Sequence, residues 1–401
     1  MLLPRPSGPY GIGRSAFDWV DVSRPADIAH PGSHAEIMVY VWYPTKVTSR
    51  DTKGVLLPGA KQIDADPNLS KGLRGELFGG NWPLVVSGFI TSHAKEDAQV
   101  DPRPKTFPVI IYSPGAFMSS FQSTSFIEDL VSHGFIVASV EHVYETFAVW
   151  FPDGRVIAYS PKDIQTEFLP PPGANQSEFG ARLQAWSRHR AEVRAADLSF
   201  ALSKLIELNN GQGNSRLRGH LDLAHVAAVG HSRGGWAAVI ACRKDSRFSA
   251  CVNLDGNAAG EGLSFPHTPE PTQPVLFVEV KPQIPSDWIV LKDLHISAED
   301  WIRRWHKIAE LEFQKFPAGG DFVELTTPGL NHNSFTDEAV LRSEKDGQLK
   351  DYHNALEGLR LSERVTRIFL NQELKLDKKA TLRNTPAVKV REFPRRRLQK
   401  Q

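Results

Sequence analysis

A serine stands between two glycines at residues 230–234, where the sequence reads Gly-His-Ser-Arg-Gly. The apolar run before it is typical of a buried strand, and the apolar residues after Gly234 recur at helical spacing. A sharp turn from strand to helix crowds the positions two residues either side of its apex, so small residues are needed there. The pattern matches a nucleophile elbow and predicts that Ser232 is an activated nucleophile.

A serine nucleophile needs a general base, and the base needs an acid to orient it. Most of the 14 histidines flank strands or lie on helices, whereas His332 lies in a turn-rich loop just beyond the last predicted strand. We therefore expect His332 to be the base. Asp255 ends a buried run and would emerge at the same edge of the sheet as the nucleophile, so it is the favoured acid. Asp300 and Glu299 are the rivals, although acids at a helix start are also explained by the helix dipole.

Two backbone N–H groups are needed to bind the oxyanion that forms when an ester carbonyl is attacked. One is expected from Arg233, at the start of the helix after the nucleophile. The second should come from the loop after strand 107–112. Pro114 in that loop has no N–H, which favours Ala116 as the donor, with Gly115 as the alternative.

Other chemistries lack support in the sequence. The segment Gly-Pro-Tyr-Gly-Ile-Gly at residues 8–13 is not the dinucleotide fingerprint and follows no strand. There is no Walker motif, no His-Glu-x-x-His motif and no clustered spacing of metal ligands. The sequence therefore predicts a hydrolase that uses no metal and no cofactor.

Strands and helices are predicted to alternate along the chain. The predicted strands are 36–44, 107–113, 135–142, 225–230, 249–254, 274–280 and 321–327; the main helices are 119–134, 181–208, 298–314 and 352–372. Such alternation predicts an α/β fold, with a mostly parallel sheet covered by helices on both faces. Residues 1–374 are expected to form a single domain, with insertions near 45–105 and 150–180 packed over the active-site edge of the sheet.

Charge and cysteine content narrow the class of protein further. The 401 residues carry a net charge of +1, so no overall field attracts nucleic acid, yet residues 375–401 carry +8. We expect this basic tail to be disordered, and it is a candidate for weak contact with anionic lipid. Two cysteines, Cys242 and Cys251, exclude a disulfide framework and a cysteine-rich zinc site. No secretory signal or membrane-spanning run is evident, which predicts a cytoplasmic protein.

Several segments together resemble the platelet-activating factor acetylhydrolases of the plasma and intracellular type II group, which act without calcium. They occur in the family's order across most of residues 8–370: GPYGIG (8–13), YSPGAF (112–117), DLVSHGFIVASVEH (129–142), VAAVGHSRGGWAAV (226–239), RFSACVNLDGN (247–257) and NHNSFTD (331–337). The blocks at 132–142 and 247–255 are the more specific ones, because general hydrolase geometry does not require them.

The resemblance implies an α/β-hydrolase fold and a triad of Ser232, Asp255 and His332. It also implies that Ala116 and Arg233 supply the oxyanion donors from their backbones. In this family the acid follows the strand beside the nucleophile strand, which independently favours Asp255. The implied substrate is a short carboxylic ester, such as the sn-2 acetyl ester of phospholipids like platelet-activating factor.

The chain also departs from the family pattern. Pro114 stands where a histidine is common, and Arg233 stands where an aromatic residue is common, which predicts a charge beside the pocket mouth. Leu77–Ile90 falls where the family has an apolar docking helix, but its glycines and proline favour pocket lining instead. Aromatic residues are expected to narrow an acyl site for short chains: Trp82, Phe89, Phe117, Trp150 and Phe151.

Two other functions are compatible with these residues. The first is hydrolysis of polyesters, lactones or secondary-metabolite esters on the same scaffold. The second is a binding protein that keeps the fold without catalysis, although the intact serine, histidine and aspartate argue against it. The sequence does not predict the oligomeric state.

Overall fold

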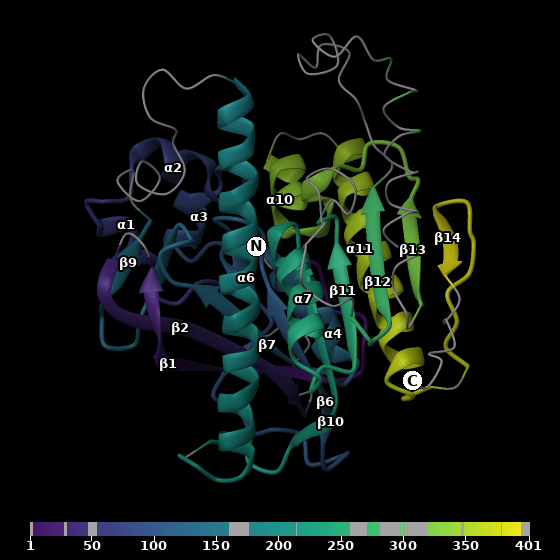
Figure 1. Ribbon diagram of the computed structural model, residues 1–401, viewed down its shortest axis with the longest axis horizontal. Coiled ribbons are helices and arrows are strands. Elements are labelled where there is room, and N and C mark those ends of the chain that lie inside the picture. Colours follow the sequence, from purple (N-terminus) through teal and green to yellow (C-terminus); the bar gives the residue numbers. More distant parts are fainter. Residues whose placement is uncertain are drawn as a thin grey trace.

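The apolar runs of the sequence assemble into one ten-stranded mixed sheet, in the order β14-β13-β12-β11-β10-β6-β7-β2-β1-β5 (Figure 1). The computed structural model describes residues 3–27, 30–46, 54–159, 176–213, 215–256, 271–280, 297, 300, 303, 319–345, 349–377 and 379–393. The sheet strands are β1 (Gly11–Asp27), β2 (His30–Thr45), β5 (Lys95–Glu96), β6 (Phe107–Ser113), β7 (Ile136–His142), β10 (Leu221–His231), β11 (Ala250–Leu254), β12 (Val275–Val280), β13 (Gly320–Leu325) and β14 (Val388–Phe393).

Helices and short elements fill the connections between these strands. The helices are α1 (Ala60–Ala65), α2 (Lys71–Glu76), α3 (Trp82–Val86), α4 (Thr124–Ser132), α6 (Gln176–Asn209), α7 (Arg233–Lys244), α10 (Asp337–Lys345) and α11 (Leu349–Glu373). Three 3-10 turns are η1 (Leu77–Gly80), η2 (Ser120–Ser123) and η3 (His332–Phe335), and two small hairpins pair β3 (Gly54–Val55) with β4 (Thr91–Ser92) and β8 (Ala148–Trp150) with β9 (Val156–Ala158).

The central strands are parallel, as the alternation of strands and helices predicts. β7, β6, β10, β11, β12 and β13 run in one direction, while β2 pairs antiparallel with β7 and β1 pairs antiparallel with β2. The carboxyl ends of the six parallel strands therefore meet at one edge of the sheet, where the loops after β10, β11 and β13 lie near one another. This is the predicted α/β-hydrolase arrangement.

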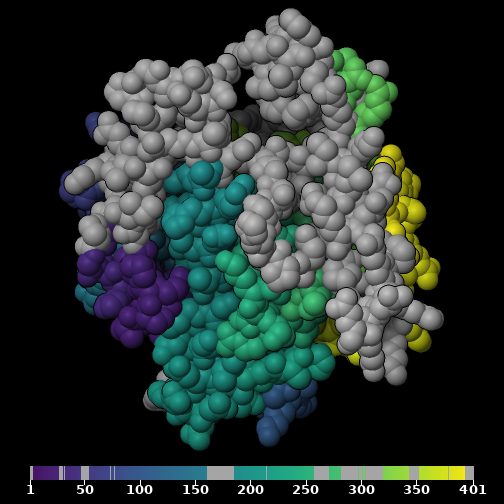
Figure 2. Space-filling model, viewed as in Figure 1, coloured from purple at the N-terminus to yellow at the C-terminus, as the bar shows by residue number. Residues whose placement is uncertain are grey.

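Strand β2 shows how the sheet divides the core into two layers. Its side chains alternate, so that Val39 and Val41 pack in one apolar cluster with α6 and α7, while Tyr40 and Trp42 pack in the other with α4 and α11. Figure 1 shows α6 crossing the front of the sheet with α7 beside it. On the surface seen from that side, α6 and α7 lie between N-terminal residues at one edge and C-terminal residues at the other (Figure 2).

The basic C-terminal segment differs from the expectation of disorder over residues 375–401. Val388–Phe393 forms β14, which pairs antiparallel with β13 along its whole length. The positive charge of the segment masks an alternating pattern in which Val388 and Val390 lie inward of exposed Lys389 and Arg391. A strand at this position covers the edge of β13 that would otherwise leave its backbone groups unpaired.

The two cysteines are paired in the structure, although their number led us to expect no disulfide framework. Cys242, near the end of α7, forms a disulfide bond with Cys251 in β11. The short connection between these elements folds α7 back onto β11, and both side chains become buried there. A single bond of this kind is compatible with the absence of a larger framework.

The insertion before β6 packs against the rest of the fold through its apolar side chains. Leu77, Phe78, Trp82 and Val85 are buried, and the turn at Gly79 lies against α10. Leu77–Ile90 therefore contributes to the core, although its Leu84 and Phe89 remain exposed. Of the helices in the described ranges, none combines the length and the hydropathy needed to cross a bilayer.

Candidate active site

The turn from β10 into α7 has the strained geometry that its sequence predicts. Ser232 has φ 55° and ψ −124°, a backbone conformation that non-glycine residues rarely adopt. A Cβ atom at Gly230 would lie 2.2 Å from the Gly234 carbonyl oxygen, and one at Gly234 would lie 2.0 Å from the Ser113 carbonyl oxygen. Glycine is therefore required at both positions for the turn to close beneath the serine.

Three side chains from distant parts of the sequence form a continuous series of hydrogen bonds at this turn. The Ser232 hydroxyl lies 2.9 Å from Nε2 of His332. On the other side of the ring, Nδ1 of His332 lies 2.6 Å from Oδ2 of Asp255. A carboxylate at Nδ1 makes that nitrogen the donor, which leaves Nε2 free to accept the serine proton. The His332 side chain is 51% exposed, so the ring can be reached from solvent.

Asp255 is held in place by backbone as well as by the histidine. It follows β11 directly with φ 51°, and its N–H donates to the Val278 carbonyl oxygen over 2.7 Å. Its second carboxylate oxygen, Oδ1, accepts from the Val280 N–H over 3.1 Å. The neighbouring strand β12 thus fixes the carboxylate that faces the histidine.

The rival acids lie elsewhere or outside the described part of the chain. Asp300 accepts a hydrogen bond from the Ser297 hydroxyl and forms an ion pair with Arg303, contacts that fit the start of a helix. Glu299 and most of the predicted helix 298–314 lie outside the described residues. Among the candidates that the structure describes, Asp255 is the one bonded to His332.

His231, the residue before the serine, supports the loop that carries His332. Its Nε2 lies 2.9 Å from the His332 carbonyl oxygen, and the two rings are 4.7 Å apart at their centroids. Burial is the main reason that the pKa of His231 lies well below its usual 6.5, and the neighbouring His332 lowers it further. The ring is therefore neutral, with its proton on Nε2, where it donates to the carbonyl oxygen.

The loop expected to supply the second oxyanion donor lies against the nucleophile turn. A Cβ at Gly234 would also lie 2.4 Å from the Pro114 carbonyl oxygen, and one at Gly115 would lie 3.2 Å from Nδ1 of His231. Ala116 follows in a turn closed by a hydrogen bond from the Met118 N–H to the Gly115 carbonyl oxygen. This places the predicted donor segment beside the serine, while the choice of Ala116 and of the Arg233 N–H stays a prediction.

A buried ion network that sequence reasoning missed holds this loop from below. Arg194 of α6 is 0% exposed and donates to the carbonyl oxygens of Pro114 and Gly115 and to the carboxylate of Glu145. Burial opposes ionisation of Glu145, but the charges of Arg194 and Arg233 outweigh it and hold the pKa of Glu145 well below its usual value. The carboxylate is therefore charged and pairs with both guanidinium groups, which leaves these three side chains with a net positive charge.

Arg233 differs from the expectation of a charge at the pocket mouth. Its guanidinium donates to Oε1 of Glu145 over 2.7 Å, and its side chain is only 12% exposed. The same group lies 4.2 Å from the ring centroid of Trp186 and 5.7 Å from that of Phe117. Its charge is thus shielded from solvent and paired with Glu145, and the guanidinium packs against these two rings.

The predicted acyl-site residues have different surroundings. Phe117 follows the predicted oxyanion donor Ala116, and it packs against Trp186 and Tyr159 and is partly exposed. Trp82 is buried against Phe147, whose N–H donates to the Phe117 carbonyl oxygen. The remaining three do not share one environment: Phe89 is exposed, Trp150 packs on Gly59, and Phe151 is buried beneath Arg155.

Comparison with protein families gives a match along almost the whole chain. The model of the family described as platelet-activating factor acetylhydrolase, isoform II, matches residues 1–387. A solved structure of a ferulic acid esterase from Streptomyces cinnamoneus superposes with a TM-score of 0.64 at 23% identity, covering 97% of this chain and 98% of the other. At that identity the superposition shows the fold alone, which is an α/β-hydrolase fold.

Curated relatives point to the same family. A probable 1-alkyl-2-acetylglycerophosphocholine esterase from Arthroderma benhamiae is 23% identical over 342 residues, 84% of this chain and 76% of the relative. Platelet-activating factor acetylhydrolases from Cavia porcellus and Bos taurus are both 25% identical over 63% of this chain. The matched part spans about half the length of these two, 55% and 54%. The chain therefore belongs to the platelet-activating factor acetylhydrolase isoform II family, and it is a carboxylic ester hydrolase.

Proposed function

We propose that the chain hydrolyses short-chain carboxylic esters through a triad of Ser232, His332 and Asp255. The observation that carries the proposal is the unbroken series of hydrogen bonds from the Ser232 hydroxyl, through both ring nitrogens of His332, to the Asp255 carboxylate. One α/β-hydrolase domain carries this activity, since the three residues follow strands of a single sheet.

In the proposed reaction, His332 takes the Ser232 proton as the oxygen attacks the ester carbonyl. Asp255 keeps the ring in the required tautomer and stabilises the imidazolium that forms. The N–H groups of Arg233 and Ala116 bind the oxyanion of the tetrahedral intermediate. Its collapse expels the alcohol with the proton from His332, and water then releases the acyl group by the same route in reverse.

The substrate that we propose is the sn-2 acetyl ester of a phospholipid like platelet-activating factor. The names of the relatives support this class. The rings of Phe117 and Trp186, which pack together beside Arg233, form an aromatic wall that supports a narrow acyl site. Such a wall favours an acetyl group over a long acyl chain by limiting the space at the carbonyl.

The triad is tested by Ser232→Ala with p-nitrophenyl acetate as substrate. We expect kcat to fall by about 10³-fold or more, since the attacking oxygen is removed while the fold is kept. Ser203→Ala, at a partly buried serine on α6, is the matched control and should keep full turnover. Intact turnover by Ser232→Ala would contradict the assignment.

The substrate class is tested separately, with a panel of esters. It compares 1-alkyl-2-acetylglycerophosphocholine with its 2-butyryl and 2-octanoyl counterparts, with triacetin, and with a lactone and a soluble polyester. We expect the acetyl phospholipid to have the highest kcat/KM. A preference for the octanoyl ester would overturn the short acyl site, and a preference for the lactone or polyester would favour the alternative substrate class.

A further inference from the structure

A second series of serine, histidine and aspartate lies beside the loop after β6. The hydroxyl of Ser113, the last residue of β6, lies 2.9 Å from Nε2 of His142, the last residue of β7. Nδ1 of His142 lies 2.8 Å from Oδ2 of Asp197 on α6. The residue types and the atoms in contact are the same as in the proposed triad, so the two series differ only in their surroundings.

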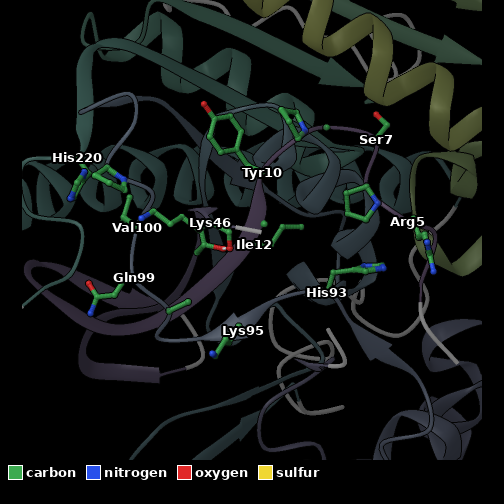
Figure 3. Close-up of a pocket in the computed structure, with 17 residues that line it drawn as sticks. Arg5, Ser7, Tyr10, Ile12, Lys46, His93, Lys95, Gln99, Val100 and His220 are labelled. Carbon is green, nitrogen blue, oxygen red and sulfur yellow. The ribbon is translucent and has the colours of Figure 1, made fainter. Parts of the chain in front are cut away.

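Burial excludes Ser113 as a second nucleophile. Its side chain is 0% exposed, and His142 and Asp197 are also buried. A cavity of about 790 Å³ lies beside the start of β1 and the residue before β10 (Figure 3), and none of these three residues lines it. A smaller cavity, of about 10 Å³, touches His142 and Asp197 but not Ser113, and it holds at most one water molecule. A hydroxyl enclosed in this way cannot attack an ester, so the series acts through the structure around it.

The direction of each hydrogen bond follows from the charges around His142. Burial, and then the nearby charge of Arg194, lower the pKa of His142 below its usual value, so the ring is neutral. Because the Asp197 carboxylate accepts, Nδ1 carries the ring proton, and Nε2 is left to accept from the Ser113 hydroxyl. The other carboxylate oxygen of Asp197 accepts from Arg24 over 2.8 Å, which holds the carboxylate from its far side.

The Ser113 oxygen is also held from a second direction. Arg194 donates to it over 3.4 Å, and the same guanidinium donates to the carbonyl oxygens of Pro114 and Gly115. The hydroxyl can accept this bond because its own proton points to His142. One hydroxyl therefore links the His142 ring to the guanidinium that holds the next two residues of the loop.

Ser113 connects the two backbone segments that are predicted to bind the oxyanion. It lies opposite Gly230 in the pairing of β6 with β10, and a Cβ at Gly234 would lie 2.0 Å from its carbonyl oxygen. Its own chain continues to Ala116. A shift of Ser113 would therefore change the position of the Ala116 N–H relative to the Arg233 N–H.

The connection after β7 supports the same loop at later points. Oε1 of Glu141 accepts from the Ser120 N–H over 2.7 Å, and the Phe147 N–H donates to the Phe117 carbonyl oxygen over 3.0 Å. With His142, this short segment contacts the loop near its start, its middle and its end. The loop geometry thus depends on partners outside the loop, of which His142 is the first along the chain.

From the buried series, the shared Ser113 hydroxyl and the contact of Ser113 with the nucleophile turn, we propose that Ser113 and His142 are positioning residues for the ester hydrolysis. They set the distance between the two N–H groups that bind the oxyanion, while Asp197 fixes the tautomer of His142. A small displacement of such donors is costly in rate, although neither residue contacts the substrate. The inference rests on the proposed function, since it requires Ser232 to be the nucleophile.

The first test removes only the hydroxyl of Ser113. In the full chain, we expect Ser113→Ala to lower kcat for p-nitrophenyl acetate about tenfold while KM changes less than about twofold. Inhibition by trifluoroacetone should weaken by a similar factor, because its adduct with Ser232 places an oxyanion at the same two N–H groups. Unchanged kcat and unchanged inhibition would overturn the proposal.

Ser132→Ala is the matched control for the loss of a buried hydroxyl. Ser132 ends α4, and its hydroxyl donates to the Asp129 carbonyl oxygen over 2.7 Å. Both variants lose a buried hydrogen bond, so both should be less stable to urea by a comparable amount. A positioning role lowers kcat and weakens inhibition in Ser113→Ala alone. An equal loss of kcat in Ser132→Ala would assign the effect to stability and refute positioning.

The second test replaces the ring of His142. His142→Phe fills a similar volume but can neither accept from Ser113 nor donate to Asp197, whereas His142→Gln offers an amide oxygen and an amide N–H. We expect kcat to fall about tenfold or more in His142→Phe and to be at least about threefold higher in His142→Gln. Equal kcat in the two variants would overturn the role of these hydrogen bonds. Ser113→Ala keeps the test decisive even if His142→Phe does not fold.

Ser232→Ala separates this inference from the proposed function. Turnover by Ser232→Ala would refute the proposed function itself. Loss of turnover in Ser232→Ala, together with normal kcat and normal inhibition in Ser113→Ala, would refute the positioning role alone.

Discussion

His231 donates a hydrogen bond from Nε2 to the backbone carbonyl oxygen of His332 over 2.9 Å. The residue beside the nucleophile thus holds the loop that carries the proposed base, although 101 positions separate the two in the sequence. The loop is also closed from within, because the Asn331 side chain accepts a hydrogen bond from the Asn333 N–H over 2.9 Å. The spacing between serine and imidazole depends on both contacts.

We expect His231→Phe to lower kcat for p-nitrophenyl acetate about ten- to a hundredfold with little change in KM, because a small displacement of a catalytic group is costly. Phenylalanine fills the volume but cannot donate. His231→Gln, which keeps an N–H donor, should recover part of the loss. Equal kcat for His231→Phe and the unmodified chain would show that the contact has no positioning role.

Arg194→Met should impair both the stability and the turnover of the protein. It removes the donor to the Pro114 and Gly115 carbonyl oxygens and leaves Glu145 with fewer partners, so we expect a loss of about 3–5 kcal/mol in the free energy of unfolding. Urea denaturation measures this loss.

The double variant Arg194→Met/Glu145→Gln tests whether the effect of Arg194 runs through Glu145. It leaves the buried Arg233 without its carboxylate partner, so we expect no gain in stability over the single variant, and kcat stays low because the loop after β6 has lost its support. Full recovery of kcat in the double variant would assign Arg194 a purely structural role.

Asp255→Asn tests the identity of the orienting acid against its rival. The amide keeps the shape of the side chain but no longer fixes the tautomer of His332, so we expect kcat to fall by about 10³- to 10⁴-fold. Asp300→Asn is the matched control and should leave kcat within about twofold, since Asp300 bonds to Ser297 and Arg303. The reverse order of effects would exchange the two assignments.

Glu141 should make stability depend on pH. Burial raises the pKa of Glu141 from 4.5 to about 7, despite hydrogen bonds from the Ser120 N–H and the Ser119 hydroxyl. The folded state then binds more protons than the unfolded state between these values, so the contribution of this group to stability is lost as pH rises from 4.5 through 7. The shift corresponds to roughly 3 kcal/mol.

The comparison for this effect is Glu141→Gln, which cannot ionise. We expect its free energy of unfolding, measured by urea denaturation, to exceed that of the unmodified chain at about pH 8 and to approach it at about pH 5. Glu207→Gln, at a surface glutamate paired with Lys204, should show no such difference. Parallel pH profiles for Glu141→Gln and the unmodified chain would refute the effect.

Local patterns were sufficient to predict the centre of the fold. The short apolar runs of β6, β7 and β10 and the periodic helix α6 were predicted from neighbouring residues alone. Strands β1 and β14, toward the two edges of the sheet, were not predicted. β1 carries Arg14, Asp18 and Asp21 between its apolar residues, and this charge hid its alternation, although it pairs antiparallel with β2, the next strand in the chain. β14 was missed for the same reason, since its charge resembles that of a solvated tail.

The residues of the site also fall into those that the local sequence could predict and those that it could not. Ser232, Asp255 and His332 follow motifs whose chemistry is specific, so their sequence surroundings were informative. Arg194 and Glu145 lie 49 positions apart and resemble ordinary surface charges until α6 packs on the sheet. The sequence did hold one signal of this buried network. Arg190, Arg194 and Asp197 recur at helical spacing beside small and apolar residues, which puts charged side chains on the side of the helix that packs against the core.

The bond between Cys242 and Cys251 ties the helix after the serine to the strand that leads to the aspartate. The connection between them carries Lys244 and Arg247, both of which are suitable for cleavage by trypsin. A nick there would leave two fragments joined through sulfur, so the damaged molecule would migrate as one band until a reducing agent is added.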